Sequence, residues 1–226
     1  MSESFAVVHV DAVPPGPDRG PGIADLRPVR RHLGIEAFGA NARVARAAGE
    51  VLVMPHDERA GGPYGTDGHQ ELYVVLRGRA TFTVDGEEID APVGTCVFLD
   101  RPEEQRGARA VEDGTTVLAI GGVRGEAFRV SPWEFAFAGM PAYEAERYDD
   151  AKALLLEGLE VHPGNASLLY NLACMEALSG DKDAAFEHLA QAVSNARFRG
   201  FAETDTDLDS LRDDPRFTAV VGSRPD

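Results

Sequence analysis

The stretch Gly65-Thr-Asp-Gly-His69-Gln-Glu71-Leu-Tyr-Val-Val-Leu-Arg-Gly78 decides how the first part of this chain folds. Its composition and its terminal glycine are typical of a β-strand that runs into a turn. Because side chains alternate between the two faces of a strand, four functional groups are expected on one face. They are Asp67, His69, Glu71 and Tyr73. The opposite face is aliphatic, so the polar face is the first place to look for a functional site.

Short apolar runs surround this stretch and extend to about residue 134. They lie at 35–45, 51–54, 72–76, 80–84, 95–99 and 116–120, with Gly, Pro and Asp-Gly between them. Asp85-Gly86 predicts a tight hairpin, because a type I′ turn needs positive φ. Many short strands with regular turns predict a sandwich or barrel over residues 26–134. Residues 1–25, rich in proline and glycine, are expected to form an extended arm.

After about Met140 the apolar period becomes helical. Residues 148–161, 168–178 and 184–193 carry apolar side chains at the i, i+3, i+4, i+7 spacing of an amphipathic helix. An internal repeat relates Ala151, Leu155 and Gly158 to Ala185, Leu189 and Ala192 at an offset of about 34 residues. The chain is therefore expected to be multidomain, β then α, with a short α-helical repeat domain at 135–226.

Composition narrows the classes of function. The chain has 226 residues, 43% of them hydrophobic, which is enough for packed cores. A formal net charge of −16 argues against nucleic acid and anionic membrane surfaces as partners. No apolar window reaches the length of a membrane span, and the first residues lack the pattern of a signal peptide. The two cysteines, Cys96 and Cys174, fall in different predicted domains, which favours a reducing, cytoplasmic location.

The helical half resembles tetratricopeptide-repeat (TPR) proteins over about residues 140–221. One repeat is matched by Leu169, Leu172, Ala173, Gly180, Ala185, Leu189 and Ala192, whereas the preceding repeat fits only in its second helix. The tail at 206–217 resembles the capping segment that often follows such repeats. The resemblance implies an interaction module for a protein or peptide partner. The alternative is that these helices pack on the β half or complete a dimer.

The β-rich half resembles the cupin family. The first cupin motif places two histidines ahead of a glutamate and a glycine, and Glu71 and Gly78 keep the spacing of its last two members. The two motif histidines fall on Gly65 and Asp67, with His69 as an extra histidine of the same parity. The resemblance implies a jelly-roll β-barrel, which often pairs as a homodimer through its sheet edges.

The second cupin motif is matched more loosely. Gly94 and Pro102 follow its rhythm, and Gln105 or Arg106 stands where a histidine is expected. Upstream, His56-Asp57-Glu58 has the composition of a metal-binding tripeptide, but strand alternation would separate His56 and Glu58 from Asp57.

Three functions follow as alternatives. The first is a metal-free site for a small polar or carboxylate ligand, in which arginine grips the carboxylate; its residues are His69, Glu71, Tyr73, Gln105 and Arg106. The second is a metal-dependent enzyme of the oxygenase or isomerase type, holding Fe, Mn, Ni or Zn through His56, Asp67, His69 and Glu71. The third is a scaffold that acts through its helices, with Glu71 and Arg106 paired and no chemistry in the β half.

Overall fold

The computed structural model describes residues 6–59 and 68–222. The chain divides into two compact units, Met1–Val130 and Ser131–Asp226. The sequence pattern places this boundary after residue 134; in the structure, Ser131 already precedes a helix that begins at Pro132.

The first unit is built mainly from antiparallel strands. Its elements in chain order are η1 (Val10–Ala12), β1 (Asp25–Arg27), α1 (Val29–Leu33), β2 (Gly39–Val44), β3 (Val51–His56), β4 (His69–Arg77), β5 (Arg79–Val84), β6 (Glu87–Pro92), β7 (Cys96–Leu99), β8 (Arg106–Ala110) and β9 (Thr116–Val123). The predicted Asp-Gly turn joins β5 to β6, and both of its residues have positive φ, 48° at Asp85 and 88° at Gly86.

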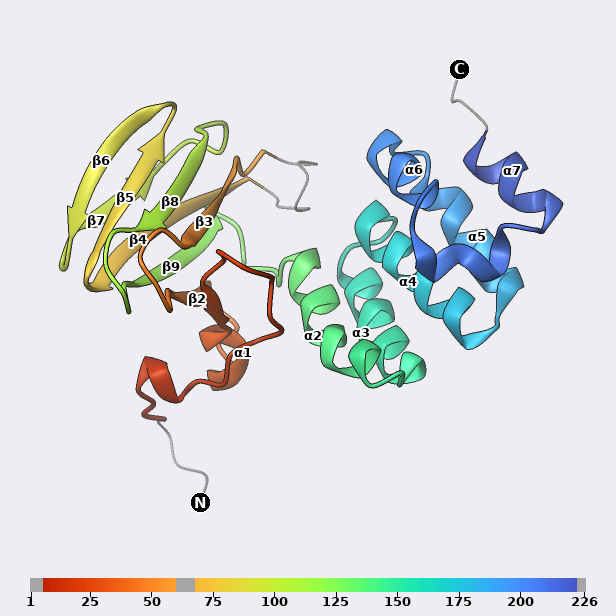
Figure 1. Ribbon diagram of the computed structural model, residues 1–226, viewed down its shortest axis with the longest axis horizontal. Helices are drawn as coiled ribbons and strands as arrows, with labels where there is room; N and C mark the ends of the chain where they lie inside the picture. Colours follow the sequence, from red (N-terminus) through yellow and green to blue (C-terminus); the bar gives the residue numbers. More distant parts are fainter. Residues whose placement is uncertain (1–5, 60–67, 223–226) are drawn as a thin grey trace. The chain divides into compact units, whose positions relative to one another are not determined.

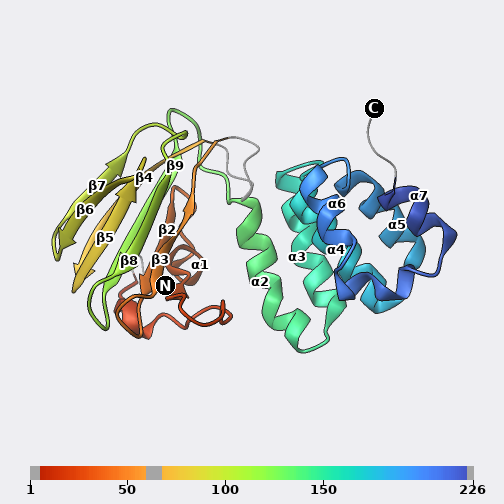
Figure 2. The same ribbon diagram turned by 45° about the horizontal axis from the view of Figure 1, so that its top comes forward.

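The strands form two sheets and not the closed barrel that the sequence predicts. One sheet has the order β1-β2-β9-β4-β7 and the other the order β3-β8-β5-β6 (Figures 1 and 2). On one side, a single parallel bridge between Ile23 and Val51 connects the segment before β1 to β3. A closed barrel needs a continuous ladder of hydrogen-bonded strands around its circumference. Apart from this bridge, the two sheets meet through side chains only among the described residues.

The core lies between the two sheets. Tyr73 and Val75 of β4 pack there with Phe82 of β5 and Val117 of β9. The Tyr73 and Phe82 rings are 5.5 Å apart between centroids. The other face of β2 is also covered, because α1 packs on this strand and leaves Ala40 and Ala42 buried. β2 therefore has a packed layer on each face, although only Ala40 and Ala42 are fully buried.

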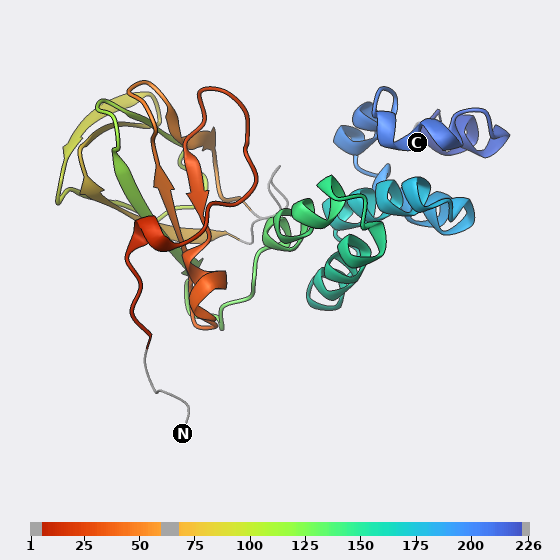
Figure 3. The same cartoon turned by 60° about the horizontal axis from the view of Figure 1, so that its bottom comes forward.

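The second unit is helical. Its elements are α2 (Pro132–Glu144), α3 (Tyr148–Val161), α4 (Ala166–Ser179), α5 (Lys182–Ala192), α6 (Ala196–Ala202), η2 (Thr206–Leu211) and α7 (Pro215–Val221). Successive helices from α2 to α5 pack on one another, and η2 packs on α4 (Figure 3). Pro141 lies inside α2, close enough to its C-terminal end that the helix continues only to Glu144.

None of the helices in the described residues combines the length and the apolar composition that crossing a membrane requires.

Candidate functional site

The inner face of β4 carries the polar groups that strand alternation predicts. Tyr73 is buried in the core, while His69 and Glu71 lie nearer the end of the sheet with side chains about 13% exposed. Gly121 of β9 pairs with Glu71 and leaves space for both, since its missing Cβ would lie 3.4 Å from Glu71 Cγ and 3.8 Å from His69 Nδ1. Asp67, the fourth predicted residue of this face, lies outside the described residues.

The last residue of β3, His56, and Glu58 just beyond it complete the cluster. His56 Nε2 is 3.0 Å from Glu58 Oε1 and 3.9 Å from Glu71 Oε2. His69 Nδ1 is 3.9 Å from the second oxygen of Glu58, Oε2. We call His56, Glu58, His69 and Glu71 the interior cluster. His56 and Glu58 lie together here, as strand alternation requires, and Asp57 does not.

The orientation of His56 is set by the backbone. Its Nδ1 donates a hydrogen bond of 2.7 Å to the carbonyl oxygen of Met54, which can only accept. The other ring nitrogen, Nε2, is thereby directed at the carboxylates of Glu58 and Glu71. A neutral ring in this tautomer offers the Nε2 lone pair to a cation, which is how a metal-binding histidine is commonly held.

Arg106 closes the cluster from β8, directly opposite His56 in the strand register. Its side chain is fully buried, and its Nε is 3.5 Å from Glu71 Oε2. The terminal nitrogens donate to the carbonyl oxygens of Pro102 and Arg101 at 3.4 Å. The guanidinium is thus committed to this protein's own groups and does not project a free fork toward a ligand.

Tyr73 supports the same carboxylate. Its hydroxyl donates a hydrogen bond of 2.6 Å to Glu71 Oε2, the oxygen that also faces Arg106 and His56. Burial beside Glu71 raises the pKa of Tyr73 well above its usual value, so the hydroxyl stays protonated and remains a donor.

The acids and the imidazole influence one another's protonation. Burial is the largest effect on the pKa of Glu71 and raises it, and the nearby charge of Glu58 raises it further. Burial lowers the pKa of His56, but the hydrogen bond to Glu58 and the charge of Glu71 outweigh this, so the pKa ends above its usual value. Without a metal, a proton on His56 Nε2 therefore neutralises part of the cluster's negative charge.

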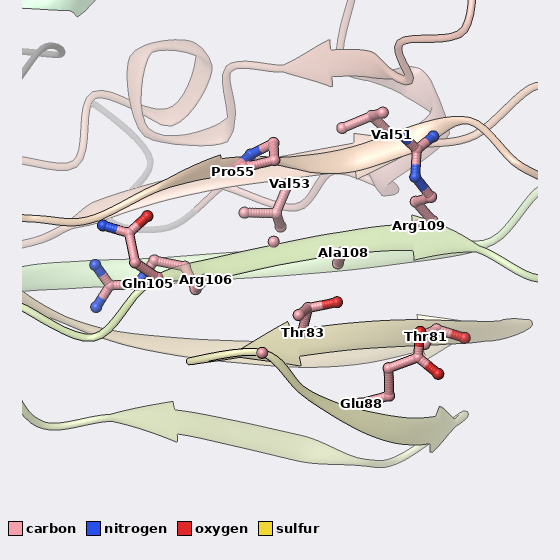
Figure 4. Close-up of a pocket in the computed structure, with 12 residues that line it drawn as sticks. Val51, Val53, Pro55, Thr81, Thr83, Glu88, Gln105, Arg106, Ala108 and Arg109 are labelled. Atoms are coloured by element: carbon pink, nitrogen blue, oxygen red, sulfur yellow. The ribbon is translucent and has the colours of Figure 1, made fainter.

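Gln105 lies away from this interior. It lies just before β8, which begins at Arg106. Its side-chain amide nitrogen donates a hydrogen bond of 2.6 Å to Asp57 Oδ2, and the same oxygen accepts a hydrogen bond from the Arg59 side chain. Gln105 lines a groove of about 300 Å³ together with Thr83 and Arg109 (Figure 4).

β2 carries two buried polar groups that the sequence patterns did not single out, on Asn41 and Arg43. They are among six buried side-chain atoms of the two units that have no hydrogen-bond partner among the described residues: Arg27 Nε, Asn41 Oδ1, Arg43 Nη1, Glu58 Oε2, Arg106 Nε and Arg199 Nε. Asn41 and Arg43 alternate with Ala40 and Ala42, a pattern that normally marks a solvent-facing side. Sequence alone offers no sign that this face of β2 is enclosed.

The interior cluster fits a divalent metal. One ligand atom from each of His56, Glu58 and Glu71 lies within 4.8 Å of the other two, and Glu58 Oε2 is buried without a hydrogen-bond partner among the described residues. A buried carboxylate oxygen without a hydrogen-bond donor destabilises the fold unless a nearby positive charge compensates for it. Mixed imidazole and carboxylate ligands suit zinc, iron, nickel or manganese.

A second group of this kind lies in the helical unit but has a structural explanation. Cys174, Asp205 and Asp207 lie close together, and the two aspartates accept hydrogen bonds from Tyr170 and Tyr143. Burial raises the pKa of the Cys174 thiol, so it stays protonated and is a poor metal ligand. These contacts hold η2 against α4 and α2.

Comparison with known proteins identifies no family profile and no curated protein that matches the chain. Among solved structures it is similar to a cupin from Bacteroides fragilis, 18% identical, covering 51% of this chain and 88% of that one, with a TM-score of 0.37. An RmlC-like cupin from Shewanella frigidimarina is 18% identical, covering 55% and 97%, with a TM-score of 0.39. A predicted oxalate decarboxylase from Thermotoga maritima is 15% identical, covering 51% and 97%, with a TM-score of 0.39.

Proposed function

We propose that the first unit is a cupin-type module that binds a divalent transition metal at the interior cluster and holds a small polar ligand beside it. The observation that carries this proposal is Glu58. Its carboxylate is 5% exposed, one oxygen contacts His56, and the other has no hydrogen-bond partner among the described residues. A buried negative charge in that position is stabilised by a cation.

The residues divide the work between them. His56, Glu58 and Glu71 would hold the metal. His69, whose Nδ1 is 3.9 Å from Glu58 Oε2, would be the fourth ligand. Arg106 and Tyr73 keep Glu71 in place through its Oε2 oxygen. A metal bound there would act as a Lewis acid toward an oxygen of the ligand. The oxygenase and isomerase classes remain the reactions that such a centre would serve.

Metal binding to the full-length protein, prepared without a polyhistidine tag, tests the proposal. We expect about one equivalent of Mn²⁺, Zn²⁺, Ni²⁺ or Fe²⁺ by elemental analysis and calorimetry. Glu58→Gln keeps the shape but removes the charge, so it should weaken binding at least tenfold. Glu88→Gln, an exposed carboxylate on β6, is the matched control and should bind like the wild type.

A metal-free binder is the second candidate, because Arg43 and Arg106 both carry positive charge into the same interior. It would be favoured if the protein held no metal but bound a small carboxylate. Arg106→Ala would not decide this alone, since Glu71 would also lose its partner. If neither metal nor carboxylate binds, the interior cluster is a structural network and the proposal fails.

We propose separately that the helical unit is TPR-like and binds a protein or peptide partner. The 34-residue offset pairs α3 with α5, and the small residues Ala151 and Ala185 are fully packed at equivalent places. Leu172→Asp would place a charge at a fully buried position of α4 and should abolish partner binding by unfolding this unit. Partner binding that survives in Leu172→Asp would contradict the assignment.

A further inference from the structure

Two polar side chains face the interior from β2, across β9 from the interior cluster. In the strand register Asn41 pairs with Ala119 and Arg43 with Val117. Ala119 in turn pairs with Tyr73 of β4, so Asn41 and Tyr73 share one face of the sheet. With a strand spacing of about 4.8 Å, the β2 and β4 backbones are roughly 10 Å apart. Ala119 and Val117 of β9 lie between them.

Each of the two side chains has one buried polar atom without a hydrogen-bond partner among the described residues. Arg43 Nη1 and Asn41 Oδ1 are sealed from solvent, and neither has a hydrogen-bond partner within 6–59 and 68–222. Arg43 also forms no ion pair with any carboxylate of that part of the chain. Both residues are partly buried as a whole, and these two atoms are their buried, unpaired groups. A buried guanidinium nitrogen without a hydrogen-bond acceptor is unfavourable, because its desolvation is not offset.

The electrostatic surroundings place Arg43 in the same interior as the cluster. Burial, and then repulsion from Arg19, lowers the pKa of Arg43 to about 10, while Tyr73 and Glu71 act in the opposite direction. Glu71 therefore acts on Arg43 across the interior, but it is already engaged by Tyr73 and Arg106.

We infer that Arg43 and Asn41 are ligand-binding residues on one side of the site, and that the ligand is a small hydroxycarboxylate. This rests on the proposed function, because it places the ligand beside the interior cluster. Arg43 takes the carboxylate through its guanidinium, which matches that group's geometry. Asn41 lies two residues from Arg43 on the same strand, roughly 6.8 Å away. Its side-chain oxygen accepts a hydrogen bond from a hydroxyl of the same ligand.

Three six-carbon probes separate the parts of this recognition. D-gluconate has both the carboxylate and hydroxyls, sorbitol has only hydroxyls, and hexanoate has only the carboxylate. Calorimetry on the full-length protein should show binding of gluconate at least tenfold tighter than of sorbitol or hexanoate. Wild-type protein that does not bind gluconate, or binds sorbitol equally well, overturns the inference.

Substitutions in β2 test whether Arg43 and Asn41 bind gluconate. Arg43→Met should weaken gluconate binding at least tenfold, whereas Arg31→Met, at an exposed arginine of α1, should leave it unchanged. Asn41→Ala should weaken gluconate binding and leave the weaker binding of hexanoate as it is. This second variant carries the test if Arg43→Met does not fold. Gluconate binding that is unchanged in Asn41→Ala and in folded Arg43→Met overturns the inference.

Metal titration of the same proteins keeps the two proposals apart. Arg43→Met should bind metal like the wild type, because Arg43 is not a ligand of the interior cluster. Metal binding without gluconate binding would end this inference and leave the metal site standing. Gluconate binding that depends on Arg43, in a protein that holds no metal, would support the inference and end the metal site.

Discussion

Gly121 shows how much the interior cluster depends on one missing side chain. A Cβ at this position would lie 3.2 Å from the carbonyl oxygen of Gln70 and 3.4 Å from Glu71 Cγ. The backbone oxygen of Gln70 cannot move away cheaply, so the strain falls on β4 beside Glu71. We therefore expect Gly121→Ala to cost about 1–3 kcal/mol of unfolding free energy and to weaken metal binding.

The neighbouring glycine supplies a matched control for this prediction. At Gly122 a Cβ would meet only a ring carbon of Phe128, at 3.9 Å, which is ordinary contact. Chemical denaturation and metal titration should therefore give Gly122→Ala values near those of the wild type. Equal effects of the two substitutions would show that the cluster does not depend on space at Gly121.

Asp214 makes the acid stability of the last helix depend on pH. Hydrogen bonds from Arg216, first from its side chain and then from its backbone, lower the pKa of Asp214 to about 2. A folded-state pKa below the unfolded value means that this carboxylate stabilises the fold above about pH 3.8 and loses that effect toward pH 2.

The corresponding variant is Asp214→Asn, which keeps an N-cap side chain but removes the charge. The wild type should melt at a higher temperature than the variant at pH 5, and the difference should shrink toward pH 2. Thermal denaturation followed by circular dichroism measures it. A difference that stays constant over this range would mean that the charge of Asp214 contributes nothing.

At the scale of elements, the packing of α3 depends on Gly158. A Cβ there would lie 2.9 Å from Leu168 Cδ1 of α4 and 2.9 Å from Phe135 Cγ of α2. Close approach of three helices explains why a glycine is tolerated inside a helix, where it costs about 1 kcal/mol relative to alanine. Gly158→Ala should therefore lower the unfolding free energy by about 1–3 kcal/mol through overpacking.

Gly139 of α2 is the matched comparison, because it is also a buried helical glycine. Its added Cβ would meet α3 at 3.7 Å, an ordinary contact distance. Gly139→Ala should therefore leave stability unchanged or raise it by up to about 1 kcal/mol. Urea denaturation of the two variants tests the difference, and a loss at Gly139 as large as that at Gly158 would refute it.

At the scale of the whole molecule, each unit has its own core, so two unfolding transitions are expected in calorimetry. Metal should raise only the transition of the first unit, because its ligands all lie there. Leu172→Asp should remove only the transition of the second unit. A single transition that moves as one with both perturbations would show that the units unfold together.

Several features of the fold could be predicted because they depend on local geometry. Strand alternation brings His69, Glu71 and Tyr73 to one face, and the Asp85-Gly86 turn needs positive φ that its residues supply. The helical period after Met140 predicts α3, α4 and α5. Pro141 is the local exception, since it lies inside α2, near the end of that helix at Glu144.

By itself, the sequence determined the order β then α, the alternation along β4 and the turn and helix signals, because these follow from backbone periods within a few residues. Only the tertiary structure decided which polar faces became interior. The packing of the two sheets enclosed the face of β2 that carries Asn41 and Arg43, and α1 covered the opposite face, which carries Ala40 and Ala42. The pairing of β8 with β3 placed Arg106 opposite His56. Burial of a face is a property of the layers packed on it, and no short stretch of sequence carries that information.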